Sequence, residues 1–199
     1  MPGLRAKTPP RHKGQLPREH HCAIVLLTPH HPHVTNNKMS SQESVSRAWE
    51  LLQDANQAQM EGDYEHALVL YQASLEQHPT AEAHTFLGWT YHFLGQLDDA
   101  IAECKKAIEV DPDFGNPYND IGAYLIELER FDEAIPWLER AVEARRYEPR
   151  HFPHYNLGRA YLAKELYSRA AACFQDALRI EPRYRLASEA LSHLRRRVN

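Results

Sequence analysis

The side chains best suited to metal chemistry lie near the start of the chain, where residues 1–38 contain six histidines. Residues 20–22 read His-His-Cys and residues 30–33 read His-His-Pro-His, and imidazole and thiolate are both zinc ligands. Their spacing fits no structural zinc pattern, and a chain without regular structure loses conformational entropy when it is held around a metal. We therefore predict no metal site and no other cofactor, and keep zinc binding by this segment as the alternative.

No catalytic motif is recognisable in the sequence. It contains no glycine-rich phosphate loop, no G-x-S-x-G and no H-E-x-x-H. Cys104 and Cys173 fall within apolar stripes of helical period, where a free thiol behaves as a small hydrophobic group. We predict a chain without enzymatic activity. Three widely spaced cysteines also predict no disulfide framework, which is typical of a reducing, cytoplasmic compartment.

Charge is distributed unevenly along the chain. Residues 1–38 hold six Lys or Arg and one acid, whereas residues 39–199 hold 17 bases and 26 acids. A body this acidic lacks the clustered cations that nucleic-acid binding requires. No apolar stretch reaches the roughly 18 residues of a membrane span, and the apolar run at residues 22–27 is shorter than a signal-peptide core. We therefore expect neither nucleic acid nor a membrane as the partner.

Residues 1–38 also differ from the rest in composition, with six prolines and no helical periodicity. Such a segment cannot bury enough apolar surface to offset its ordering entropy, so we predict a disordered, basic, His- and Pro-rich tail. A folded domain is then expected at residues 39–199. Under a second interpretation Met39, followed by the helix-start sequence Ser-Ser-Gln-Glu at residues 40–43, is the first residue of the working protein.

The folded part is organised as repeats. Ala67, Ala100, Ala134 and Ala170 are spaced by 33, 34 and 36 residues, and each is followed by a small residue seven positions later. A proline stands twelve residues after the alanine in the first, second and fourth units. Ahead of the alanine, residues 87–91 follow the pattern L-G-x2-Y, with variants in the other units. Each unit is therefore predicted to be two helices whose small residues permit close approach.

This spacing resembles the tetratricopeptide repeat family, whose signature is W-x2-L-G-x2-Y, then A-x3-F, then P. The resemblance covers about residues 42–182 in four copies, although Leu, His, Tyr and His occupy the Trp position. It implies an all-α, right-handed α–α superhelix, a solenoid of four helix pairs plus a C-terminal capping helix. The repeats are expected at about residues 48–80, 81–114, 115–150 and 151–182, and the capping helix at residues 183–198.

The third unit departs from the pattern because two residues are inserted after it. Residues 145–151 read R-R-Y-E-P-R-H, which gathers four cations and an aromatic side chain in one loop. We predict a solvated loop there, with a binding edge as the alternative.

The resemblance also implies a function, because the first helices of such units line a concave groove. We predict a non-catalytic scaffold or adaptor that binds a protein or peptide segment in this groove, with aromatic anchors and with Asn and Asp side chains that bond the peptide backbone. The alternative is a structural subunit that associates with copies of itself through the ends of the solenoid. The candidate groove residues are Trp49, Asn56, Trp89, His92, Phe93, Asn119, Asp120, Phe152, Tyr155, Asn156 and Arg159.

Overall fold

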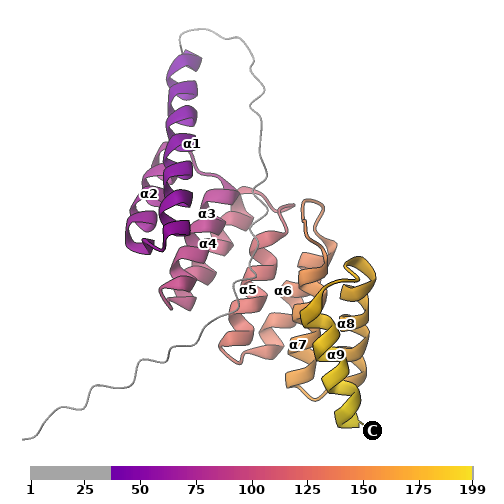
Figure 1. Ribbon diagram of the computed structural model, residues 1–199. Helices are drawn as coiled ribbons and strands as arrows, with labels where there is room; N and C mark the ends of the chain where they lie inside the picture. The colour runs from indigo at the N-terminus through magenta and orange to yellow at the C-terminus, as the bar shows by residue number, and fades with distance from the viewer. Residues whose placement is uncertain (1–36, 199) are drawn as a thin grey trace, which may run out of the picture. The chain divides into compact units, whose positions relative to one another are not determined.

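The computed structural model describes residues 37–198, which form nine α-helices and no strand (Figure 1). Consecutive helices pack together in chain order, so that the first eight form four pairs and the ninth lies against the eighth. The predicted all-α superhelix of helix pairs is confirmed. The helices are α1 (Asn37–Glu61), α2 (Tyr64–Gln77), α3 (Ala81–Phe93), α4 (Leu97–Val110), α5 (Asn116–Glu127), α6 (Phe131–Glu143), α7 (His151–Ala163), α8 (Tyr167–Ile180) and α9 (Arg185–Val198).

The predicted disordered tail and its histidine clusters lie outside the described residues, apart from the last two positions of that segment. Asn37 and Lys38 belong to α1, which has 25 residues, whereas each of the other helices has 12 to 14. α1 therefore begins eleven residues before the repeat boundary expected near residue 48.

The core lies inside and between the helix pairs. Ala67, Ala100, Ala134 and Ala170 are completely buried, as their regular spacing predicts. α9 continues this arrangement, because Leu191 packs with Phe174 of α8 in the last core cluster. Each helix pair therefore buries one side against the next pair, and α9 covers the remaining side of the fourth pair.

The turn inside each helix pair requires a left-handed backbone. Gly62 and Gly95 adopt φ angles of 84° and 77° at the first two turns. At the equivalent positions of the third and fourth pairs the residues are Glu129 and Glu165, with φ angles of 57° and 58°. A side chain in this region costs roughly 1–2 kcal/mol, because Cβ crowds the following carbonyl oxygen.

Glu129→Gly should therefore raise the free energy of unfolding by about 1 kcal/mol, since glycine adopts a positive φ without that clash. Urea denaturation measures the change. The matched control is Ala172→Gly, an exposed position inside α8, where glycine should lower stability by about 1 kcal/mol. A loss of stability in both variants would contradict the prediction.

The inserted loop after α6 docks on the loop that precedes α5. The Gly115 N–H donates to the Arg146 carbonyl oxygen at 2.9 Å, and the Arg146 N–H donates to the Asp113 carbonyl oxygen at 3.0 Å. Tyr147 is buried against Gly115, where a Cβ would lie 2.4 Å from the Tyr147 Cβ. The Arg146 guanidinium lies over Phe114 and pairs with Glu82 of α3. This loop is thus a tether between units, and only its outer residues fit the prediction of a solvated loop.

Candidate interaction face

The first helices of the four pairs, α1, α3, α5 and α7, contact one another in chain order. We call the surface that they form the first-helix face. All eleven candidate groove residues lie on these helices, as follows: Trp49 and Asn56 on α1; Trp89, His92 and Phe93 on α3; Asn119 and Asp120 on α5; Phe152, Tyr155, Asn156 and Arg159 on α7.

A chain of side-chain hydrogen bonds, here called the polar ladder, joins three of these helices. The Trp89 indole Nε1–H donates to Asp120 Oδ2 at 2.6 Å, and Asn119 Nδ2 donates to Asp120 Oδ1 at 3.3 Å. Asn156 Nδ2 donates to Asn119 Oδ1 at 3.0 Å, and Arg159 Nη1 donates to Asn156 Oδ1 at 3.0 Å. The ladder therefore fixes the register of α3, α5 and α7.

Burial decides what the amides of the polar ladder can do. Asn119 and Asn156 are only 8% and 7% exposed, so each bond that they make is largely shielded from water. A buried amide without a partner would cost roughly 1–3 kcal/mol, and the ladder supplies those partners. Bonding of a peptide backbone by these two residues stays a prediction, while their contacts here are between helices.

The Asp120 carboxyl is the electrostatically unusual group of this face. Burial raises the pKa of this carboxyl to about 6. The hydrogen bonds from Trp89 and Asn119 and the nearby His92 lower the pKa, but by less than burial raises it. A carboxyl with such a pKa gains a proton in the mildly acidic range. The centre of the ladder therefore changes charge close to neutral pH.

His92 and Phe93 lie at the end of α3 and have different surroundings. His92 Nε2 is 3.1 Å from both carboxylate oxygens of Glu127, and its ring stacks on Tyr124 with centroids 4.8 Å apart. Phe93 stacks on Tyr64 at 5.0 Å and keeps 40% of its surface exposed. His92 is thus part of the contact between α3 and α5, whereas Phe93 offers an open apolar surface.

The α1 part of the face is also apolar and open. Trp49 is 41% exposed and Met60 is 67% exposed. Asn56, between them, accepts a hydrogen bond from the Tyr71 hydroxyl at 2.6 Å, which ties α1 to α2. Trp49, Met60 and Phe93 are therefore large apolar side chains that the first helices leave to solvent, as is Val45 of α1, which is 44% exposed.

The two aromatic candidates on α7 contact Tyr184, which lies outside the repeat pattern and carries no signal in the sequence. Tyr184, just before α9, meets Phe152 edge-on at 5.7 Å and Tyr155 at 5.2 Å. Tyr155 also contacts Phe174 of the core at 5.8 Å. Phe152 and Tyr155 are therefore partly covered by their own chain.

α9 extends the first-helix face by one more helix. Trp89, Ala123, Arg159 and His193 follow one another at 34, 36 and 34 residues, so His193 is the α9 counterpart of Trp89. The same register places Arg196 and Arg197 at the positions of His92 and Phe93. We call His193, Arg196 and Arg197 the α9 basic residues. Continuing the repeat spacing one step past the last proline would have found them in the sequence.

Reactive or metal-binding groups are not gathered on this face. Among residues 37–198 no cluster of three or more His, Cys, Asp or Glu side chains is placed to hold a metal ion. Burial raises the pKa of the Cys104 thiol well above its usual range and that of Cys173 to about 11, so both thiols stay protonated. None of the helices in the described part is long and apolar enough to cross a membrane.

Two family models match the chain, and both are described as tetratricopeptide repeat. One covers residues 81–114 and the other residues 113–182, which together span the second, third and fourth helix pairs.

Curated relatives match about half of the chain. Small glutamine-rich tetratricopeptide repeat-containing protein 2 of Mycosarcoma maydis is 30% identical over 104 residues, which are 52% of this chain and 30% of that protein. Protein SGT1 homolog of Oryza sativa subsp. japonica is 34% identical over 97 residues, 48% of this chain and 26% of that protein. The chain thus spans less than a third of the length of either relative.

Solved structures share the fold over a larger part of the chain. The structure of pilF from Pseudomonas aeruginosa has a TM-score of 0.70 at 24% identity and covers 77% of this chain and 68% of that one. A crystal structure of MamA has a TM-score of 0.62 at 23% identity, with 70% and 81% covered. At these identities the likeness concerns the fold alone.

Proposed function

Since the chain belongs to the tetratricopeptide repeat family, we propose that it is a non-catalytic protein-interaction adaptor whose first-helix face holds a segment of a partner protein. The observation that carries this proposal is the exposure of Trp49, Met60 and Phe93 on that face. Aromatic side chains and methionine are enriched at protein interfaces, and a large apolar group gains most from removal from water.

The polar ladder supports the same proposal by making the face rigid. Trp89, Asp120 and Asn119 form a bonded series across α3 and α5, and Asn156 continues it to α7. A surface whose helices are already in register loses little conformational freedom when a partner binds, so more of the contact free energy appears as affinity. The ladder is thus a scaffold, and the exposed apolar side chains beside it are the proposed contacts.

The test replaces exposed side chains and leaves the ladder intact. Trp49→Ala with Phe93→Ala should reduce the capture of bound proteins from native lysate by at least about tenfold, the loss typical of two interface anchors. The matched control is Val69→Ala with Val110→Ala, since Val69 and Val110 are 59% and 46% exposed on the second helices α2 and α4.

The readout is quantitative mass spectrometry of the captured proteins, with circular dichroism to show that both double variants keep their helices. Specific loss in the Trp49 and Phe93 variant supports the proposal. Equal recovery of the same proteins by that variant, by the control and by the unchanged chain would refute it.

A further inference from the structure

We propose that the first-helix face continues onto α9 and ends there in a binding site for an acidic peptide segment that carries an aliphatic side chain. This inference rests on the proposed adaptor function, because it names the kind of segment that the face would hold. It goes further by assigning a site to the α9 basic residues.

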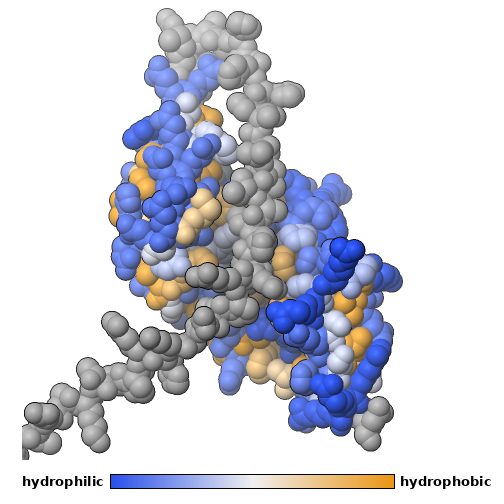
Figure 2. Space-filling model, viewed as in Figure 1, coloured by the Kyte–Doolittle hydropathy of each residue, from blue (hydrophilic) through white to orange (hydrophobic). Residues whose placement is uncertain are grey.

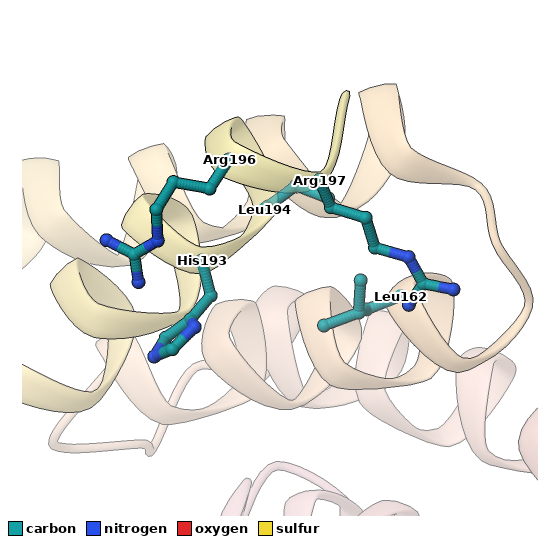
Figure 3. Close-up of a pocket in the computed structure, with 5 residues that line it drawn as sticks. All are labelled: Leu162, His193, Leu194, Arg196 and Arg197. Carbon is teal, nitrogen blue, oxygen red and sulfur yellow. The ribbon is translucent and has the colours of Figure 1, made fainter. Parts of the chain in front are cut away.

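The site is a hollow of about 390 Å³ between the end of α7 and the last two turns of α9. Its lining consists of Leu162, His193, Leu194, Arg196 and Arg197. Figure 3 shows the Arg196 and His193 side chains on one side of the hollow and Arg197 with Leu162 on the other. Two leucines and three basic side chains therefore border one opening.

The two arginines of this hollow are only partly neutralised by their own chain. Arg197 lies over the Tyr167 ring and pairs with Glu165 at 3.6 Å, where both side chains are mostly exposed. The Arg196 and His193 side chains form no hydrogen bond or ion pair with any other residue of the part that the structure describes. An incoming carboxylate would thus meet the Arg196 guanidinium without displacing an internal partner.

The wider charge distribution favours an acidic ligand at this end of the chain. Residues 145–199 hold 12 Lys or Arg and 5 acids, whereas residues 39–144 hold 5 bases and 21 acids. In Figure 2 the deepest blue on the visible side gathers around α9. Because the first three pairs repel an acidic segment and the last pair attracts it, the field would bring that segment to α9.

The form of the hollow favours a peptide over a nucleic acid. Leu162 and Leu194 provide an apolar floor that suits an aliphatic side chain. A nucleic acid would need a track of cations along its backbone, and the three acidic helix pairs that precede α7 repel such a polyanion. An alternation of acidic and aliphatic residues fits both the rim and the floor.

The experiment measures fluorescence anisotropy with a labelled, C-terminally amidated peptide of sequence Gly-Ser-Glu-Leu-Glu-Leu-Gly-Ser and the full chain. Its matched probe carries Gln in place of both Glu residues. We expect the acidic probe to bind at least about tenfold more tightly than the Gln probe. Arg196→Glu with Arg197→Glu should weaken binding of the acidic probe by at least about tenfold, because attraction becomes repulsion.

The control is Arg195→Glu, which reverses a charge on the same helix outside the hollow, and it should change the affinity less than about threefold. Equal affinity for the two probes, or an unchanged affinity in the double variant, would overturn the proposal. Tighter binding of single-stranded RNA or of anionic vesicles than of the acidic probe would also overturn it. So would a concentration-dependent mass in light scattering that the double variant abolishes, since a second copy would then be the occupant.

Failure of this inference is distinguishable from failure of the adaptor function. If the Trp49 and Phe93 variant loses its captured proteins while charge reversal leaves the acidic probe bound, only the α9 site is refuted. If capture does not depend on Trp49 and Phe93, the proposed adaptor function is refuted, whether or not the acidic probe binds.

Discussion

Gly158→Ala should lower the free energy of unfolding by about 2–3 kcal/mol, at the upper end of the usual cost of overpacking a core. A Cβ at this position would lie 2.4 Å from Phe174 Cε1 and 2.5 Å from Cδ1. The Phe174 ring is completely buried and also contacts Tyr155 and Leu191, so it has no free space to move into. Urea denaturation followed by circular dichroism measures the loss.

Two companion variants test the cause. Gly88→Ala should cost less, because its added Cβ would lie 3.2 Å from the nearest atoms, the Ala100 carbonyl oxygen and Cys104 Sγ. Gly158→Ala combined with Phe174→Leu should lose less stability than the sum of the two single changes, since the smaller side chain makes room for the methyl group. Strictly additive losses, or a neutral Gly158→Ala, would show that the close contact is not the limiting feature.

The parts of the fold that the sequence predicts are those that depend on local spacing. The buried alanines recur at a nearly constant distance because each helix pair repeats the same contact, so Ala100 and Ala134 identify an interface without any structure. A glycine marks the left-handed turn in the first two units, at Gly62 and Gly95. No glycine marks it at Glu129, because the left-handed backbone there is imposed by the packing of the flanking helices and not by the residue type.

The polar ladder shows why part of the candidate site was hidden from sequence reasoning. The spacing of 36 residues between the third and fourth units places Tyr155, not Asn156, opposite Asn119. The Asn156–Asn119 bond therefore joins positions that are not equivalent, and only the offset of α7 against α5 brings them together. The sequence pattern predicts these side chains to face a partner, whereas in the structure several of them are bonded to one another.

The inserted loop fits the prediction of a solvated loop only in part, because Tyr147 is buried while Arg145, Arg146 and Glu148 are exposed. Tyr147 and Arg146 stand in a highly charged stretch, which is typical of a solvent-exposed loop. Their partners, Gly115 and Phe114, belong to a loop more than thirty residues earlier, and two loops without periodicity give no signal of their pairing. Burial of Tyr147 in this contact is a property of the superhelix, in which loops at the same end of successive pairs are neighbours.

Stability should also depend on pH through Asp120. In the unfolded chain its pKa is near 3.8, whereas burial raises it to about 6 in the folded protein. Well below pH 3.8 the carboxyl is protonated in both states and contributes nothing. As pH rises toward 6 the unfolded state loses its proton first, so the folded state binds more protons and becomes less stable. Above the folded pKa the full loss is about 3 kcal/mol, since one pKa unit corresponds to about 1.4 kcal/mol.

Asp120→Asn should remove this dependence, because an amide does not titrate, while its oxygen can still accept the Trp89 indole hydrogen. The change also removes an acceptor of Asn119, which shifts the stability by an amount that does not vary with pH. His151 and His154 act in the opposite direction, since burial lowers the pKa of both and favours the folded state as pH rises through 6.5.

The measured quantity is therefore the difference between the unfolding free energies of the Asp120→Asn variant and the unchanged chain, taken from urea denaturation between pH 4 and pH 8. Titration of the two histidines is common to both chains and cancels in that difference. We expect the difference to move in favour of the variant by about 2.5 kcal/mol over this range, with most of the change between pH 4 and 6.5. A difference that stays constant over this range would mean that the Asp120 carboxyl titrates alike in the folded and unfolded chains, so that its place in the polar ladder carries no electrostatic cost.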